Sequence, residues 1–156
     1  MTRPHYDDLR AVPLPNDREL IPHLQVMIEQ ALRRQVWIMF LDEQSRPLPI
    51  VIPIDVAAEA REGDATALIA SLSCLLLDFE GASLVITLER PGPMETMDRD
   101  SRWLRSLREA CVGSGRAFRG PYLMLGDRIV QVPPDDYVGT PWAYSVADGY
   151  DDQSSF

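Results

Sequence analysis

Residues 81–101 read GASLVITLERPGPMETMDRDS, and this stretch carries the clearest indication of the fold. Gly81 is typical of the residue that ends a helix. Residues 83–88 form a short apolar run, which predicts a buried strand. A Pro-Gly-Pro turn follows, and acidic residues then open an amphipathic segment over residues 98–112. The pattern therefore predicts a strand that leads through a tight turn into a helix with an acidic first turn.

The rest of the chain supplies further elements on either side of this stretch. Apolar residues at three- and four-residue spacing predict two earlier helices. The first of them is expected to start at Pro22, because a proline deeper in a helix costs about 3 kcal/mol. Pairs of apolar runs separated by turns predict two hairpins. The expected helices are 22–34, 64–80 and 98–112, and the expected strands are 36–41, 48–54, 83–88, 122–125 and 128–132.

This order of elements predicts a three-layer α/β fold in a single domain, with a mixed sheet and helices on both faces. Three prolines on the second strand, Pro47, Pro49 and Pro53, cannot donate ladder hydrogen bonds and favour a place at the sheet edge. The expected organisation is an extended arm over residues 1–15, the domain over 16–134, and an acidic aromatic tail over 135–156.

Composition excludes several kinds of chemistry. All fifteen basic residues are arginine, so neither a phosphate-binding P-loop lysine nor a Schiff-base lysine is available. The net charge of −9 argues against nucleic acid as a partner, since that affinity depends on clustered cations. With two cysteines, no signal peptide at its start and no apolar stretch of about twenty residues, the chain is expected to be cytoplasmic and to have no membrane partner.

Residues 20–132 resemble the JAB/MPN superfamily, and within it the RadC-like branch, in element order and spacing. The metal motif of this family is His-x-His, seven residues, Ser, two residues and Asp, in which both histidines and the aspartate bind zinc. Aligning Pro91 with the proline that follows the second histidine in RadC-like members places Leu88 and Arg90 at the two histidine positions. It places Asp98 at the serine and Ser101 at the aspartate. The resemblance implies a JAB/MPN-like, cytidine-deaminase-like fold.

None of the three ligand positions holds a residue suited to zinc. Leucine has no donor atom, arginine is a cation, and neutral serine is a poor substitute for a carboxylate. The nearest counterpart of the family's catalytic glutamate is Gln35, which cannot act as a general base, and Gly120-Pro121 stands where RadC-like members carry an Asp-His pair. The resemblance therefore implies no catalytic residue, no metal and no cofactor.

Charged residues at the end of the predicted strand allow a second interpretation. Glu89, Arg90, Asp98 and Asp100 are candidate ligand-binding residues, because ligands gather at strand ends in α/β sheets. Carboxylates could bind Mg²⁺, and arginine beside carboxylates can orient an anionic or polar ligand. The structural alternative is that Asp98 or Asp100 stabilises the start of the helix while Glu89 and Glu95 remain in water.

Other residues with catalytic potential have structural explanations. His5 lies on the arm and His23 early in the first helix, both far in sequence from any nucleophile. Cys74 and Cys111 are interpreted as small buried hydrophobic residues. Trp103 is expected in the core, with a role as an anchor for a partner as the alternative.

The tail interleaves aromatic residues with aspartates, and Trp142 and Tyr144 are its candidate partner-binding residues. Its aromatic content is too high for a purely solvating tail, so it either packs on the domain or docks into another molecule. Packing is expected for residues 137–144, and disorder beyond 148.

The leading hypothesis is a noncatalytic domain, a pseudoenzyme, that acts through protein–protein interaction, with self-association as one form. The proline-rich strand and the aromatic tail are the candidate contact surfaces. The alternative is an enzyme or small-molecule binder with a remodelled site around Glu89, Arg90, Asp98 and Asp100. A DNA-repair accessory role is disfavoured by the net charge.

Overall fold

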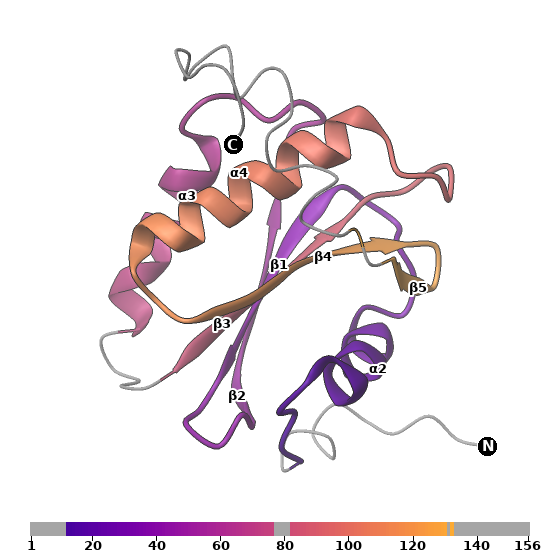
Figure 1. Ribbon diagram of the computed structural model, residues 1–156. Coiled ribbons are helices and arrows are strands. Elements are labelled where there is room, and N and C mark those ends of the chain that lie inside the picture. The colour runs from indigo at the N-terminus through magenta and orange to yellow at the C-terminus, as the bar shows by residue number, and fades with distance from the viewer. Residues whose placement is uncertain (1–11, 77–81, 131, 133–156) are drawn as a thin grey trace, which may run out of the picture.

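The computed structural model describes residues 12–76, 82–130 and 132, with backbone alone over 73–76. Within these ranges the chain forms one small α/β domain with a five-stranded mixed sheet and three helices (Figure 1). The elements are α2 (Asp17–Ile28), β1 (Gln35–Leu41), β2 (Pro47–Asp55), α3 (Asp64–Leu76), β3 (Ser83–Glu89), α4 (Asp98–Ser114), β4 (Phe118–Leu125) and β5 (Arg128–Val130). The predicted class and element order are confirmed.

The sheet has the strand order β2-β1-β3-β4-β5. β1 pairs antiparallel with both β2 and β3, β3 pairs parallel with β4, and β4 pairs antiparallel with β5. The parallel pair requires a crossover, which α4 provides. The proline-rich strand β2 lies at one edge, as its missing donors predicted, and β5 is the edge strand on the other side among the described residues.

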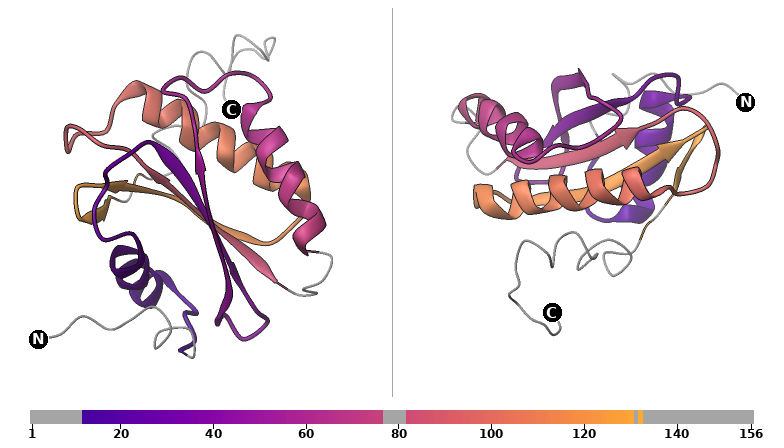
Figure 2. Two further views of the ribbon diagram at one scale, coloured as in Figure 1. Left: turned by 180° about the vertical axis from the view of Figure 1, so that it is seen from behind. Right: turned by 90° about the horizontal axis from the view of Figure 1, so that it is seen from above.

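The helices cover the two faces of the sheet unequally. α3 and α4 lie next to one another on one face, whereas α2 lies away from them (Figures 1 and 2). Successive side chains of a strand point to opposite faces of the sheet. Leu84 and Ile86 of β3 accordingly pack with α3 and α4, while Val85 packs with α2. The described chain therefore has the three layers that the element order predicted.

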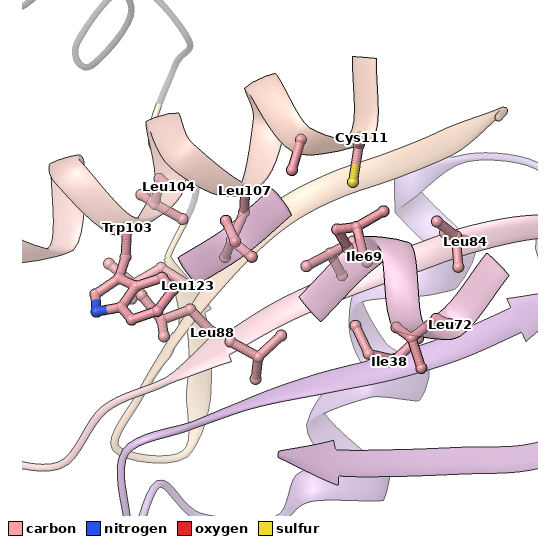
Figure 3. Close-up of a cluster of buried hydrophobic side chains, with 14 of the residues drawn as sticks. Ile38, Ile69, Leu72, Leu84, Leu88, Trp103, Leu104, Leu107, Cys111 and Leu123 are labelled. Carbon is pink, nitrogen blue, oxygen red and sulfur yellow. The ribbon is translucent and has the colours of Figure 1, made fainter. Parts of the chain in front are cut away.

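The larger core lies between the sheet and the pair α3 and α4 (Figure 3). α4 contributes Trp103, Leu107 and Cys111, and α3 contributes Ile69 and Leu72, all of them buried. The three- and four-residue spacing on α4 thus marked its buried face correctly. The expectation that Trp103 belongs to the core is confirmed as well.

The first helix was placed wrongly by the sequence. It spans Asp17–Ile28, instead of residues 22–34, and Pro22 lies inside it on the exposed side. The side-chain oxygen of Asn16 accepts a hydrogen bond from the Arg18 backbone N–H at 3.0 Å. This cap satisfies a donor of the first turn. The carbonyl that loses a donor because of Pro22 belongs to Arg18, an exposed residue, so the proline is tolerated.

The segment between α2 and β1 leaves the helical path because it is held by other parts of the chain. Glu29 has a φ of 70° and ends the helix. The Ala31 N–H then donates to the Gly126 carbonyl at 2.7 Å, across the turn between β4 and β5. These long-range contacts explain why residues 29–34 do not continue the helix.

Two further boundaries differ from the prediction. α4 continues through Gly113 to Ser114, and Gly115, with a φ of 75°, forms its C-cap. β4 begins at Phe118, earlier than the predicted residue 122, since it pairs with β3 from Leu84 onward. The predicted helix end at Gly81 lies outside the described residues, as do most of the arm and the tail.

No helix in the described ranges combines the length and the apolar character that crossing a bilayer requires.

Candidate functional site

The candidate site lies where β3 ends, in the connection 90–97 and at the start of α4. Glu89, Arg90 and Asp100 are buried there, with exposed fractions of 2%, 1% and 2%, whereas Asp98 is exposed. The prediction grouped these four residues in one crevice. The hydrogen bonds of the three buried residues instead form two separate networks within the described chain, one around Arg90 and Asp100 and one around Glu89.

Arg90 forms the first network. Its Nε donates to Asp100 Oδ1 at 3.0 Å, and its Nη2 donates to Asp100 Oδ2 at 2.6 Å and to the Glu95 carbonyl at 2.7 Å. Its Nη1 donates to the carbonyls of Pro93, at 2.5 Å, and Pro91, at 3.3 Å. A guanidinium has five N–H donors, so every donor of Arg90 is used within the protein.

Asp100 links this network to the start of α4. Its Oδ2 also accepts the Met97 backbone N–H at 2.9 Å, which satisfies a donor at the first turn of the helix. A carboxylate at this position also interacts favourably with the positive end of the helix. Asp100 therefore stabilises the helix start, and Asp98, the first residue of α4, points into solvent.

Together these contacts fix the conformation of the loop 91–97, which we call the clamped loop. The guanidinium of Arg90 lies inside the loop and binds three of its carbonyl groups, while its bidentate pairing with Asp100 joins the loop to α4. An arginine used in this way has no remaining donor for a ligand. The clamped loop is thus a structural unit built around a buried ion pair.

Glu89 forms the second network, on the side of the sheet that faces α2. Its Oε2 accepts the backbone N–H groups of Leu32, at 2.6 Å, and Arg33, at 3.0 Å. Its Oε1 accepts from Gln35 Nε2 and from Trp37 Nε1, both at 2.7 Å. Each carboxylate oxygen therefore has two donors, and the expectation that Glu89 remains in water is wrong.

The Glu89 network explains both the path of residues 29–34 and the role of Gln35. Gln35 and Glu89 are direct partners across the β1–β3 ladder, so their side chains lie on the same face. Gln35, the counterpart of the family's catalytic glutamate in the resemblance, orients its amide toward a carboxylate of the fold. No local pattern in the sequence indicated this network, because Glu89 is more than fifty residues away from each of its donors.

Gly120 lies in β4 at a position that admits no side chain. Its φ is +97°, and a Cβ atom built there would lie 2.6 Å from the Ile86 carbonyl oxygen. The β3–β4 register is irregular beside it, between Val85 and Thr87. Glycine at this position is therefore required both by the backbone conformation and by the closeness of the neighbouring strand.

The Gly120→Ala variant is expected to lose about 3 kcal/mol of unfolding free energy, because the added methyl group meets backbone and the positive φ disfavours alanine. Denaturant unfolding followed by circular dichroism measures the loss. Gly113→Ala is the matched control, since nothing lies within 4 Å of its Cβ position and alanine favours the helix, so it should be neutral or stabilising. Equal stabilities of the two variants would contradict this explanation.

The remaining candidates are also structural within the described chain. Burial raises the pKa of the Cys111 thiol to about 11, which makes it a poor nucleophile. No three His, Cys, Asp or Glu residues among those described lie close enough together to hold a metal ion. His5, Trp142 and Tyr144 lie outside the described residues, and so does the side chain of Cys74.

His23 is buried in α2, against the expectation of a half-exposed residue, and burial lowers its pKa below the usual 6.5. The unfolded chain therefore binds a proton at a higher pH than the folded chain does. We expect wild-type stability to fall as the pH is lowered from 7.5 to 5.5, and to fall less in the His23→Gln variant. Urea midpoints at the two pH values measure this, and an equal fall in both proteins would contradict it.

No model of a known protein family matches this chain, and a search of curated proteins finds no significant match. The geometry of the described residues is therefore the basis for any functional conclusion.

Proposed function

We propose that this chain is a noncatalytic domain of the JAB/MPN-like, RadC-like type that acts by binding a protein partner. The element order of the described chain, helix, two strands, helix, strand, helix and two strands, is the order on which the resemblance rests. The helices on both faces of a mixed sheet agree with the same proposal. Fold likeness alone assigns no activity, so the proposal depends on the candidate site.

The observation that carries the proposal is the complete internal use of Arg90. It occupies a position where the resemblance expects a zinc-binding histidine, and all its donors bind Asp100 or the clamped loop. Metal ligands at such a position must offer a lone pair, which a guanidinium lacks. The same residue that is unsuited to zinc thus has a structural role that explains its presence.

Gly120 supports the proposal independently. The resemblance places an Asp-His pair at Gly120-Pro121, and no side chain of any kind fits at Gly120 in this fold. The backbone of β4 therefore has no room for an aspartate side chain at position 120. This supports the proposal that the site of the resemblance is noncatalytic in this chain.

The alternative, a ligand site around Glu89, Arg90, Asp98 and Asp100, stays a prediction with less support. Three of these residues are buried and engaged within the fold, and Asp98 is the exposed one. A single exposed carboxylate gives little basis for ligand recognition.

Exposed apolar side chains at the same end of the sheet favour a binding role. Leu32 is 74% exposed and Met94 is 49% exposed. Gly126 lies close to both segments: its carbonyl accepts the N–H of Ala31, the residue before Leu32, and a Cβ built on it would lie 2.8 Å from Met94 Sδ. The Glu89 network holds the backbone of Leu32, and the clamped loop contains Met94. Exposed apolar side chains on a fixed backbone are typical of binding surfaces.

The noncatalytic part of the proposal is tested with purified protein and peptide, isopeptide-linked and phosphodiester substrates, each with Zn²⁺, Mn²⁺ or Mg²⁺. We expect no turnover above that of the metal ion alone. Turnover that EDTA removes, and that Asp98→Asn lowers, would support the remodelled site instead. Asp98 suits this comparison because its exposed side chain can be changed without disturbing the core.

The binding part requires a partner identified by affinity capture and then purified. Leu32→Asp/Met94→Asp should weaken its binding at least about tenfold, because both changes place a charge in the contact surface. Val112→Asp is the control, since Val112 is 60% exposed but lies near the other end of α4. If the control weakens binding and the double variant does not, the contact surface is elsewhere.

A further inference from the structure

The open edge of β2 has fewer backbone hydrogen-bond donors than an ordinary edge strand, because β2 contains prolines. In an antiparallel ladder, alternate residues direct their N–H and C=O groups toward one neighbour, and the residues between direct theirs to the other side. The Val56 N–H donates to the Arg34 carbonyl at 3.3 Å, which continues the β1–β2 register by one pair. In the regular part of this register, residues 51–56, even-numbered residues therefore face β1 and odd-numbered residues face outward. The register is irregular between Met39 and Leu41, opposite residues 47–51 of β2.

Hydrogen bonds on the far side of β1 give the same assignment. The Leu84 N–H donates to the Ala117 carbonyl and the Arg90 N–H donates to the Met124 carbonyl, so even-numbered residues of β3 face β4. Odd-numbered residues of β3 then face odd-numbered residues of β1, because Gln35 pairs with Glu89. Even-numbered residues of β1 are left to face β2, as the Val56 contact requires.

The outward positions of β2 are consequently poor in donors. Over the regular part of the register they are Val51, Pro53 and Asp55, and Pro53 is exposed. Proline has no backbone N–H, so the middle one of these three outward donors is missing. A strand that approached this edge would leave its own carbonyl opposite Pro53 without a partner.

The β5 edge is closed in a different way. Arg128 pairs with Leu125 next to the two-residue turn, which leaves Ile129 as the residue of β5 that faces outward. Its N–H donates to the side-chain oxygen Oε1 of Gln25 at 2.8 Å, from α2. The outward donor of the described part of β5 is thus already satisfied by a helix of the same domain.

We infer that both edges of the described sheet are closed to strand addition, β2 by Pro53 at an outward position and by the register irregularity around Pro49, and β5 by the Gln25 side chain. Open edges invite pairing with other chains, and natural proteins block them with proline and covering helices. This chain therefore binds neither a second copy of itself nor an extended peptide by extending its sheet. The inference does not depend on the proposed function, and it limits any contact of the proline-rich strand to its two faces.

The Pro49→Thr/Pro53→Thr variant tests the β2 edge, because it supplies the backbone N–H groups that both prolines lack. We expect sedimentation velocity to show a larger species than the wild type at the same concentration, increasing with concentration. Pro13→Thr/Pro15→Thr changes two exposed prolines outside the sheet and should sediment as the wild type does. A folded edge variant that sediments as the wild type would overturn the inference.

Amide exchange of the wild type gives a second test that needs no β2 variant. The Val51 and Asp55 N–H groups should exchange at least about tenfold faster than those of Ile52 and Ile54, which face β1. Protection of Val51 equal to that of Ile52 would mean that the edge is already paired, and would overturn the inference.

For β5, Gln25→Ala should accelerate exchange of the Ile129 N–H, because the variant removes its acceptor. An unchanged exchange rate would contradict the closure of the β5 edge.

Discussion

Replacing Arg90 by methionine is expected to lower the unfolding free energy by about 4 kcal/mol. The substitution leaves the Asp100 carboxylate buried without its cation, and breaking such a pair typically costs about 3–5 kcal/mol. The carbonyls of Pro93 and Glu95 lose their donors at the same time. Chemical denaturation followed by tryptophan fluorescence measures the loss, and Trp103 on α4 lies close enough to report the unfolding of this end of the domain.

Arg99→Met is the matched control for this variant. Arg99 lies on the same helix, but its contact with Glu59 is long, 3.7 Å, and both side chains are substantially exposed. Exposed pairs of this kind contribute about 1 kcal/mol or less. If Arg90→Met cost no more than Arg99→Met, Arg90 would not hold the clamped loop, and a role in ligand binding would regain support.

Replacing Glu89 by glutamine is expected to lower the unfolding free energy by about 3 kcal/mol. Each carboxylate oxygen of Glu89 accepts from two donors, so whichever end becomes the amide NH₂ meets two N–H groups. A buried donor left unsatisfied costs about 1–3 kcal/mol. Denaturation midpoints measure the total loss, and the indole N–H resonance of Trp37 reports whether its bond to Glu89 persists.

Glu95→Gln is the control, because the Glu95 side chain is exposed and its contact with Arg90 uses the backbone carbonyl. It should unfold as the wild type does. Equal midpoints for Glu89→Gln and Glu95→Gln would show that the four contacts of Glu89 contribute little. The path of residues 29–34 would then need a different explanation.

Local patterns in the sequence were enough for most of the architecture. The apolar run of β3 and the spacing of Trp103, Leu107 and Cys111 on α4 depend on near neighbours in the chain, and the structure agrees with both. The prolines of β2 indicated an edge strand because a missing donor is a property of the residue itself. These features need no knowledge of which distant segments meet.

The candidate site could not be derived in the same way. Glu89 is exposed or buried according to whether residues 32–37 supply donors, and nothing near Glu89 in sequence indicates that they do. The penalty for Pro22 was outweighed by the Asn16 cap and by burial of Leu20 and Leu24, which tertiary structure provides. Grouping charges by their closeness in sequence therefore joined two networks that the fold separates.

Calorimetric titration of the purified wild type with Zn²⁺ tests whether the charged residues at the end of β3 stabilise the fold and hold no metal. We expect no stoichiometric binding and no rise in the unfolding temperature on adding the metal. Tight binding of one Zn²⁺ per chain that Asp98→Asn abolishes would contradict it, and would make the end of β3 a metal site.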